Sequence, residues 1–268
     1  MKALFVDMDG TLLTSDKRIS DEDLKSINEM TDKGHYVVIN TGRPLYSVLL
    51  LLEEYGLIKK NVYVSSFNGG LLYDPVNKKK LLYHSIENED VRYLLDAAEK
   101  AGIHAHTYSD THVLSKYDTK PLQFYTKRIR MPALITEDFE KELTDKPPKV
   151  ILITLDDREV LEKFREDNKA YTDGRLYATF SDARLLEYAN PKVSKGAAVK
   201  FMCEYLGISK EDAVAAGDEE NDVPMFKEAA VGVCMKNGSD IAKENADFIT
   251  ERSCDENGVS EIIKKYFI

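Results

Sequence analysis

Apolar runs of strand length alternate with segments of helical periodicity through the first 65 residues, and this alternation limits the fold more than any other feature. Three apolar runs predict strands, at residues 2–7, 35–40 and 61–66. Two segments with apolar side chains at helical spacing predict helices between them, at 20–34 and 45–56. Ser20 is the expected N-cap of the first helix and Gly34 its expected end. The order β-α-β-α-β predicts a parallel sheet with helices on both faces, an α/β fold of Rossmann-like type.

The same alternation returns after residue 187, whereas the segment between is organised differently. Residues 84–186 pair predicted helices with adjacent predicted strands, which is typical of an α+β module. We therefore predict a core domain formed by residues 1–83 and 187–268, with residues 84–186 inserted as a second domain.

Composition excludes several classes of partner. The chain has 268 residues, a net charge of -10 and no long block of Lys or Arg, so a nucleic-acid partner is not expected. Apolar stretches stay well below the roughly 18 residues that a membrane span needs, so no membrane partner is expected. The cysteines Cys203, Cys234 and Cys254 are few and far apart, which favours a reducing cytoplasm. The sequence gives no prediction of oligomeric state.

Polar residues follow three of the predicted strands, in the stretches FVDMDGT, VINTGR and VAAGDEEND. Ligands of open parallel sheets bind beyond the carboxyl ends of the strands, so these stretches are expected to meet at one edge. The side chains they supply are Asp7, Asp9, Thr41, Arg43, Asp218, Asn221 and Asp222.

The first stretch has its own chemistry. Asp7 and Asp9 point to the same side of an extended chain, where two carboxylates repel each other unless a cation lies between them or one of them is protonated. With Asp218 as a third oxygen ligand, Mg²⁺ is the expected metal. Backbone N–H groups at Gly10 and Thr11 can bind an anion, so a phosphate site is predicted. Helix capping and turn formation are the alternative for any single Asp of the set.

Four motifs in order, DMDGT, TGR, SKG and GDEEND, give the chain a resemblance to the haloacid dehalogenase-type (HAD) phosphatase superfamily. The large insertion between the second and third motifs resembles the Cof-type sugar phosphatases, which carry an α/β cap at that point. This resemblance implies a Mg²⁺-dependent phosphoric monoester hydrolase that acts on a small phosphorylated metabolite, with a sugar phosphate as the family expectation.

The resemblance also implies roles for single residues. It makes Asp7 the nucleophile that becomes an aspartyl phosphate and Asp9 the general acid and base. It makes Lys195 the cation that offsets charge on Asp7 and on the phosphoryl oxygens. The implied metal ligands are Asp7, the backbone carbonyl of Asp9, Asp218 and Asp222. The implied substrate-binding residues are Gly10, Thr41, Gly42 and Asn221.

Several further residues are ambiguous in the sequence. Arg43 fits a structural ion pair as well as catalysis, and the Asn68-Gly69 pair fits a plain turn as well as a contact with the cap. The chain reads NPK before VSKG, where relatives often have a glycine, which leaves the conformation of the loop before Lys195 open. The histidines His104, His106 and His112 are expected on a solvent-facing strand side. The sequence has neither a GxxxxGK[ST] nor a GxGxxG motif.

Two other functions stay open at this point. Phosphomannomutases resemble the same motif set, and there the aspartyl phosphate is returned to a sugar. A module that binds a phosphorylated metabolite without catalysis is the second alternative, although a binder has no need of Asp9. The residues of the cap have no readable code for the leaving alcohol, so the substrate is not predicted.

Overall fold

The computed structural model describes the backbone of residues 1–268 and every side chain except that of Asp182. The chain divides into two compact units. The core unit is formed by three segments, Met1–Arg43, Val48–Leu82 and Ser194–Ile268. The inserted unit is formed by Pro44–Ser47 and Tyr83–Val193.

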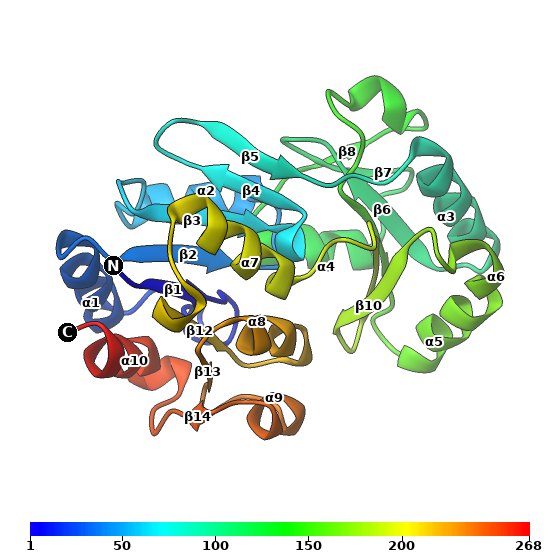
Figure 1. Ribbon diagram of the computed structural model, residues 1–268. Coiled ribbons are helices and arrows are strands. Elements are labelled where there is room, and N and C mark those ends of the chain that lie inside the picture. The colour runs from blue at the N-terminus through cyan, green and yellow to red at the C-terminus, as the bar shows by residue number, and fades with distance from the viewer. The chain divides into compact units, whose positions relative to one another are not determined.

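The core unit is built on a mostly parallel sheet of order β14-β13-β12-β1-β2-β3-β4-β5 (Figure 1). Its strands are β1 (Ala3–Val6), β2 (Tyr36–Asn40), β3 (Val62–Ser66), β4 (Leu71–Asp74), β5 (Lys79–Tyr83), β12 (Ala213–Gly217), β13 (Val231–Cys234) and β14 (Phe248–Ile249). Pairing is parallel from β14 to β3 and antiparallel between β3 and β4. All residues of β1 are buried, as expected of a parallel strand covered on both faces.

Helices cover the core sheet. They are α1 (Asp21–Asp32), α2 (Leu45–Glu54), α7 (Lys195–Leu206), α8 (Val223–Glu228), α9 (Asp240–Glu244) and α10 (Gly258–Tyr266). Helices α7 and α8 contribute Met202 and Phe226 to an apolar cluster with Phe5 of β1. Helices α1 and α10 lie side by side (Figure 1). Ser20 accepts a hydrogen bond from the Asp23 N–H, which confirms the predicted N-cap of α1.

The strand order reverses at β1, and the crevice beside this reversal, the switch point of the sheet, is where we expect the site. From β1 the chain continues through β2 and β3 on one side, whereas β12, β13 and β14 extend the sheet on the other. Val6 is in register with Ala216 of β12 and with Ile39 of β2, so these three strands end together. Side chains that follow β1 and β12 therefore meet at the switch point, where α/β sheets bind their ligands.

The inserted unit has a sheet of order β10-β11-β9-β6-β7-β8. Its strands are β6 (His104–Tyr108), β7 (Val113–Ser115), β8 (Ala133–Ile135), β9 (Lys149–Ile153), β10 (Tyr177–Asp182) and β11 (Leu185–Ala189). Its helices are α3 (Asn88–Lys100), α4 (Lys120–Ile129), α5 (Arg158–Asp167) and α6 (Lys169–Thr172). Leu94 of α3 and Phe164 of α5 pack with Leu152 and Tyr188 of the sheet, so one face of this sheet carries an apolar core.

The predicted fold class, a parallel core with helices on both faces and an inserted α+β unit, is confirmed. The expectation for the histidines of β6 is wrong, because His106 is fully buried and His104 is partly buried. Their rings form a hydrogen-bonded chain instead, with 3.1 Å between His104 Nε2 and His106 Nδ1 and 3.2 Å between His106 Nε2 and the Tyr108 hydroxyl. Among the described residues, no helix combines the length and apolar character that crossing a bilayer requires.

Candidate active site

Asp7 follows β1 directly, and the sheet fixes its backbone. Its N–H donates to the carbonyl oxygen of Ala216 in β12 over 2.9 Å, which continues the parallel pairing by one residue. The side chain is only 9% exposed. Burial raises the pKa of the Asp7 carboxyl, although the Lys195 ammonium acts in the opposite direction. A buried carboxylate at a strand end requires a compensating cation.

Asp218 reaches the same point from β12. The hydroxyl of Thr11 donates to its Oδ1 over 2.8 Å. Burial raises the pKa of Asp218, and the neighbouring charges of Asp7 and Asp222 raise it further. Gly10 has a φ of 79°, and a Cβ there would lie 2.2 Å from Asp218 Oδ2. The DGT turn therefore requires glycine both for its left-handed backbone and for the approach of Asp218.

Asp222 organises the loop after β12. Its Oδ2 accepts the N–H groups of Asp218 at 2.9 Å and of Glu219 at 3.0 Å, and its Oδ1 lies 2.5 Å from Lys195 Nζ. A Cβ on Gly217 would come within 2.3 Å of the Asp222 carboxyl carbon, so the GD pair of the motif allows the loop to close. Both carboxylate oxygens of Asp222 thus accept hydrogen bonds, one from Lys195 and the other from the backbone of the loop after β12.

Lys195 is the first residue of α7, and its side chain is 1% exposed. Its Nζ lies 2.7 Å from Asp7 Oδ1 and 2.5 Å from Asp222 Oδ1. Burial alone would lower the pKa of Lys195, but the charges of Asp222 and Asp7 hold it above its usual value. Ser194 caps the helix, and a Cβ on Gly69 would lie 2.4 Å from the Ser194 carbonyl oxygen. The preceding loop, whose conformation the sequence left open, forms a turn in which the Val193 N–H donates to the Asn190 carbonyl oxygen over 2.9 Å.

Asp9 is held by two cations that come from different segments. Arg43 donates from Nε to Asp9 Oδ2 at 2.6 Å and from Nη2 to Oδ1 at 2.8 Å. Lys17 donates from Nζ to Oδ1 at 2.7 Å. Burial alone would raise the pKa of Asp9, but the hydrogen bonds and charges of Arg43 and Lys17 hold it well below its usual range. The sequence left Arg43 ambiguous, and it gave no signal for Lys17.

The remaining predicted residues lie at the ends of β2 and β12. Thr41 is buried, and its hydroxyl accepts the Arg43 N–H over 3.2 Å. A Cβ on Gly42 would lie 3.1 Å from Asn68 Oδ1, and Asn221 donates to the same oxygen over 3.3 Å. Asn68 has a φ of 58°, a left-handed conformation that asparagine tolerates better than most residues. The Asn68 turn thus lies against both the second and the fourth motif.

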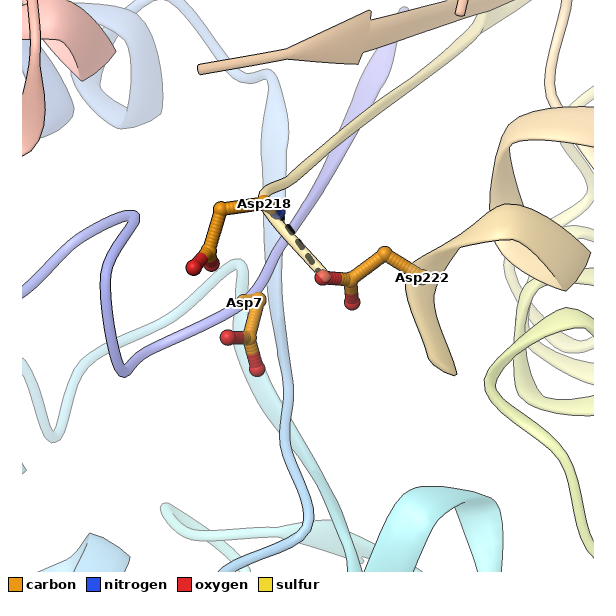
Figure 2. Close-up of side chains that lie close together, drawn as sticks. All are labelled: Asp7, Asp218 and Asp222. Atoms are coloured by element: carbon orange, nitrogen blue, oxygen red, sulfur yellow. Dashed lines mark hydrogen bonds between the residues drawn. The ribbon is translucent and has the colours of Figure 1, made fainter. Parts of the chain in front are cut away.

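The carboxylates of Asp7, Asp218 and Asp222 form one cluster, shown in Figure 2. Each offers an oxygen atom within 4.8 Å of the others, and all three are buried. With all three carboxylates ionised, the cluster and Lys195 together have a net charge of -2. The donor set is all oxygen, which fits a hard divalent cation such as Mg²⁺ and not a soft one.

Comparisons with known families and solved structures identify the family of this chain. The family model described as haloacid dehalogenase-like hydrolase matches residues 4–263. The chain is 30% identical over 275 residues to the 5-amino-6-(5-phospho-D-ribitylamino)uracil phosphatase YcsE of Bacillus subtilis, covering 100% of this chain and 96% of that protein. It is 29% identical to YitU of the same organism, which is also named a 5-amino-6-(5-phospho-D-ribitylamino)uracil phosphatase; the match covers 98% of this chain and 96% of YitU. The crystal structure of a haloacid dehalogenase-like hydrolase from Bacteroides thetaiotaomicron superposes with a TM-score of 0.92 at 27% identity, covering 99% of each chain.

Proposed function

Because the chain belongs to the haloacid dehalogenase-like hydrolase family, we propose that it is a Mg²⁺-dependent phosphatase that works through an aspartyl phosphate on Asp7. One observation supports this most strongly: Asp7 is buried at the switch point with its Oδ1 2.7 Å from Lys195 Nζ. The ammonium favours the ionised form of the carboxyl group, which is the form that acts as a nucleophile. The same ammonium can neutralise oxygens of a bound phosphoryl group.

In the first half-reaction, an Asp7 oxygen attacks phosphorus and the bond from phosphorus to the alcohol oxygen breaks. The leaving oxygen takes a proton from the Asp9 carboxyl, so a neutral alcohol departs. Asp9 follows Asp7 by two residues, and its side chain is 24% exposed. Arg43 and Lys17 favour its ionised form in the ligand-free protein, so this step requires the bound phosphate to compete for these cations before Asp9 holds the proton that it donates.

In the second half-reaction, water attacks the phosphorus of the aspartyl phosphate. Asp9 now takes the proton from the water, and the bond between phosphorus and the Asp7 oxygen breaks. Inorganic phosphate leaves, and Asp7 and Asp9 return to their starting states. Covalent catalysis thus divides one difficult displacement into two easier ones.

Mg²⁺ would be held by Asp7, Asp218 and the backbone carbonyl of Asp9. Bound there, the ion would neutralise charge on the phosphoryl oxygens and on the carboxylates. Asp222 contributes differently in this proposal, because both of its oxygens already accept hydrogen bonds from Lys195 and from backbone N–H groups. We therefore assign Asp222 to the support of the metal site.

The proposed substrates are small phosphorylated metabolites with an alcohol leaving group, such as sugar and polyol phosphates. The names of YcsE and YitU include a phosphorylated ribityl chain, which is a polyol phosphate. We propose that residues 84–186 act as the cap that recognises the alcohol. Cys203, Cys234 and Cys254 are free thiols, and the proposal includes the reducing cytoplasm as the compartment.

The test is phosphate release from a panel of sugar, polyol and nucleoside monophosphates, with Mg²⁺ and with EDTA. Asp7→Asn should abolish release, whereas Asp32→Asn, a matched change at a side chain that is 81% exposed, should leave it unchanged. Full activity of the Asp7 variant, or activity that EDTA does not affect, would refute the proposal. Isomerised sugar phosphate without phosphate release would indicate a mutase instead.

A further inference from the structure

A cavity of about 560 Å³ lies within the inserted unit. Every residue that lines it belongs to that unit, and none of them is a residue of the proposed active site. Its walls are formed by α3, β6, β7, the first turn of α4 and the short 3-10 helix Phe139–Glu142. Close-packed protein interiors leave few voids larger than a water molecule, whereas ligand pockets have volumes of about 300–1,000 Å³. The size of the cavity therefore indicates a ligand site.

The inner wall of the cavity is apolar. Leu114 and Phe139 line it and are buried members of the hydrophobic core of the inserted unit. Leu95, Ile103 and Ala105 also line it, and they are packed against the same core. A ligand with an apolar body would remove this wall and its own surface from water, which is favourable. The wall therefore fits an aromatic or aliphatic ligand body.

The exposed charged residues of the lining form a rim that is negative overall. The rim has five carboxylates and two cations, a net charge of -3. Both cations are already paired with rim carboxylates, Arg92 Nε with Glu140 Oε1 at 2.6 Å and Lys116 Nζ with Glu99 Oε2 at 2.8 Å. His104 also lines the cavity, but burial lowers its pKa to about 4, so it adds no positive charge at neutral pH. The rim therefore repels anions, and a phosphorylated substrate is not the expected ligand.

The other three rim carboxylates differ in their partners. Asp138 Oδ2 lies 2.9 Å from Nζ of Lys141, a residue outside the lining. Asp96 of α3 and Glu137, which follows β8, are exposed and have no ion pair with any side chain that the structure describes. A positive group at the rim can pair with either of these two carboxylates while an apolar body contacts the inner wall. The lining thus favours a ligand that is apolar at one end and cationic at the other.

We propose that this cavity is a second ligand site, which binds a small organic cation composed of a protonated amine and an aromatic or aliphatic body. The body contacts the inner wall, and the ammonium group pairs with Asp96 or Glu137 at the rim. This site is separate from the proposed phosphatase chemistry, because its apolar wall and negative rim suit neither a phosphoryl group nor the metal that would bind it.

The experiment uses three probes that share an indole body and differ in charge: tryptamine is a cation, tryptophol is neutral and indole-3-acetate is an anion. The chain has no tryptophan, so the fluorescence anisotropy of each probe can be followed without indole emission from the protein. Full-length protein is titrated into each probe, with Mg²⁺ present to compete for the carboxylates of Asp7 and Asp218. We expect tryptamine to bind about tenfold more tightly than tryptophol, and indole-3-acetate to bind more weakly than both.

Variants separate the rim from the inner wall. The double variant Asp96→Asn/Glu137→Gln should weaken tryptamine binding to the level of tryptophol, and should change the Kd of tryptophol by less than about twofold. Its matched control is Glu159→Gln/Asp173→Asn, which removes two charges from exposed side chains of the same unit that do not line the cavity and should leave every Kd unchanged. Ala105→Phe fills the space beside the inner wall, so it should weaken tryptamine and tryptophol alike by about tenfold or more. Far-UV circular dichroism checks that each variant is folded.

Absence of saturable tryptamine binding would overturn the inference, and so would equal affinity for the three probes. Undiminished tryptamine binding by folded Ala105→Phe would place the probe elsewhere on the protein and overturn it as well. If Ala105→Phe does not fold, the double variant at Asp96 and Glu137 decides, because both of its changes are on exposed side chains. A preference for tryptamine that survives in the double variant would contradict the proposed role of the rim. None of these results bears on phosphate release, so the proposed function is tested separately.

Discussion

Replacement of Lys195 by methionine should destabilise the core unit strongly, and Mg²⁺ should reduce the loss. The ammonium lies 2.7 Å from Asp7 and 2.5 Å from Asp222, and all three side chains are buried. At an effective dielectric constant of about 20, one such pair has a Coulomb energy of about 6 kcal/mol, and desolvation cancels a large part of it. Removing one partner of a buried pair usually costs about 3–5 kcal/mol. Since two carboxylates lose their partner here, we expect about 5 kcal/mol.

The assay is urea unfolding followed by far-UV circular dichroism at pH 7.5, in EDTA and in Mg²⁺. The matched control is Lys200→Met, which makes the same change on the exposed side of α7 and should alter the free energy of unfolding by less than about 0.5 kcal/mol. A ligand at 100 times its Kd stabilises a protein by about 2.7 kcal/mol, so Mg²⁺ at that excess should raise the free energy of unfolding of the Lys195 variant by about this amount over its value in EDTA. Equal stability of the two variants in EDTA would refute the electrostatic account of the cluster.

Two further predictions concern single residues of the core unit. The buried Asp23 carboxyl accepts the Ser260 N–H at its Oδ1. Burial raises the pKa of Asp23 from 3.8 to about 6. The protonated carboxyl therefore contributes fully to stability below about pH 4, and this contribution is lost as the pH rises through about 6. Relative to wild type, Asp23→Asn should therefore gain up to about 3 kcal/mol between pH 4 and pH 7 in urea unfolding, and a pH-independent difference would contradict this. Gly10→Ala should lower Mg²⁺ affinity and phosphate release by at least about tenfold, because its Cβ would meet Asp218. Gly56→Ala is the control, because Gly56 has a φ of 64° and open space around it; this change should cost only about 1 kcal/mol of stability. An equal loss of Mg²⁺ affinity in the Gly10→Ala and Gly56→Ala variants, measured by titration, would reject the argument from the Asp218 contact.

The sequence predicted the core well, because its pattern there is strong and local. Buried parallel strands appear as short apolar runs, and the polar residues that follow them must meet at one edge of the sheet. Asp7 and Asp218 are 211 positions apart in the chain, yet their convergence could be predicted from that rule alone. The predicted family and enzyme class, a HAD-type phosphatase, are confirmed by the comparisons. The domain boundaries and the roles of the site residues stay predictions.

Other features depended on tertiary context. The strands β4 and β5 and the helix α4 were missed, although Thr119 with Pro121 two positions later is a helix-start signal that could have indicated α4. His106 alternates along its strand like a solvent-facing residue, but it is fully buried and hydrogen-bonded. The contact between Lys17 and Asp9 depends on one left-handed residue, which no periodicity reveals.

The central claim is that Asp7 becomes phosphorylated and that Asp9 completes the cycle. Its most direct test uses Asp9→Asn with p-nitrophenyl phosphate, a substrate that needs no proton for the first step but needs a base for the second. We predict a burst of one p-nitrophenolate per enzyme molecule, followed by slow turnover. After acid quenching, mass spectrometry should find one phosphoryl group on the N-terminal peptide, located at Asp7. Rapid turnover without a burst, or a phosphoryl group on any other residue, would contradict the account.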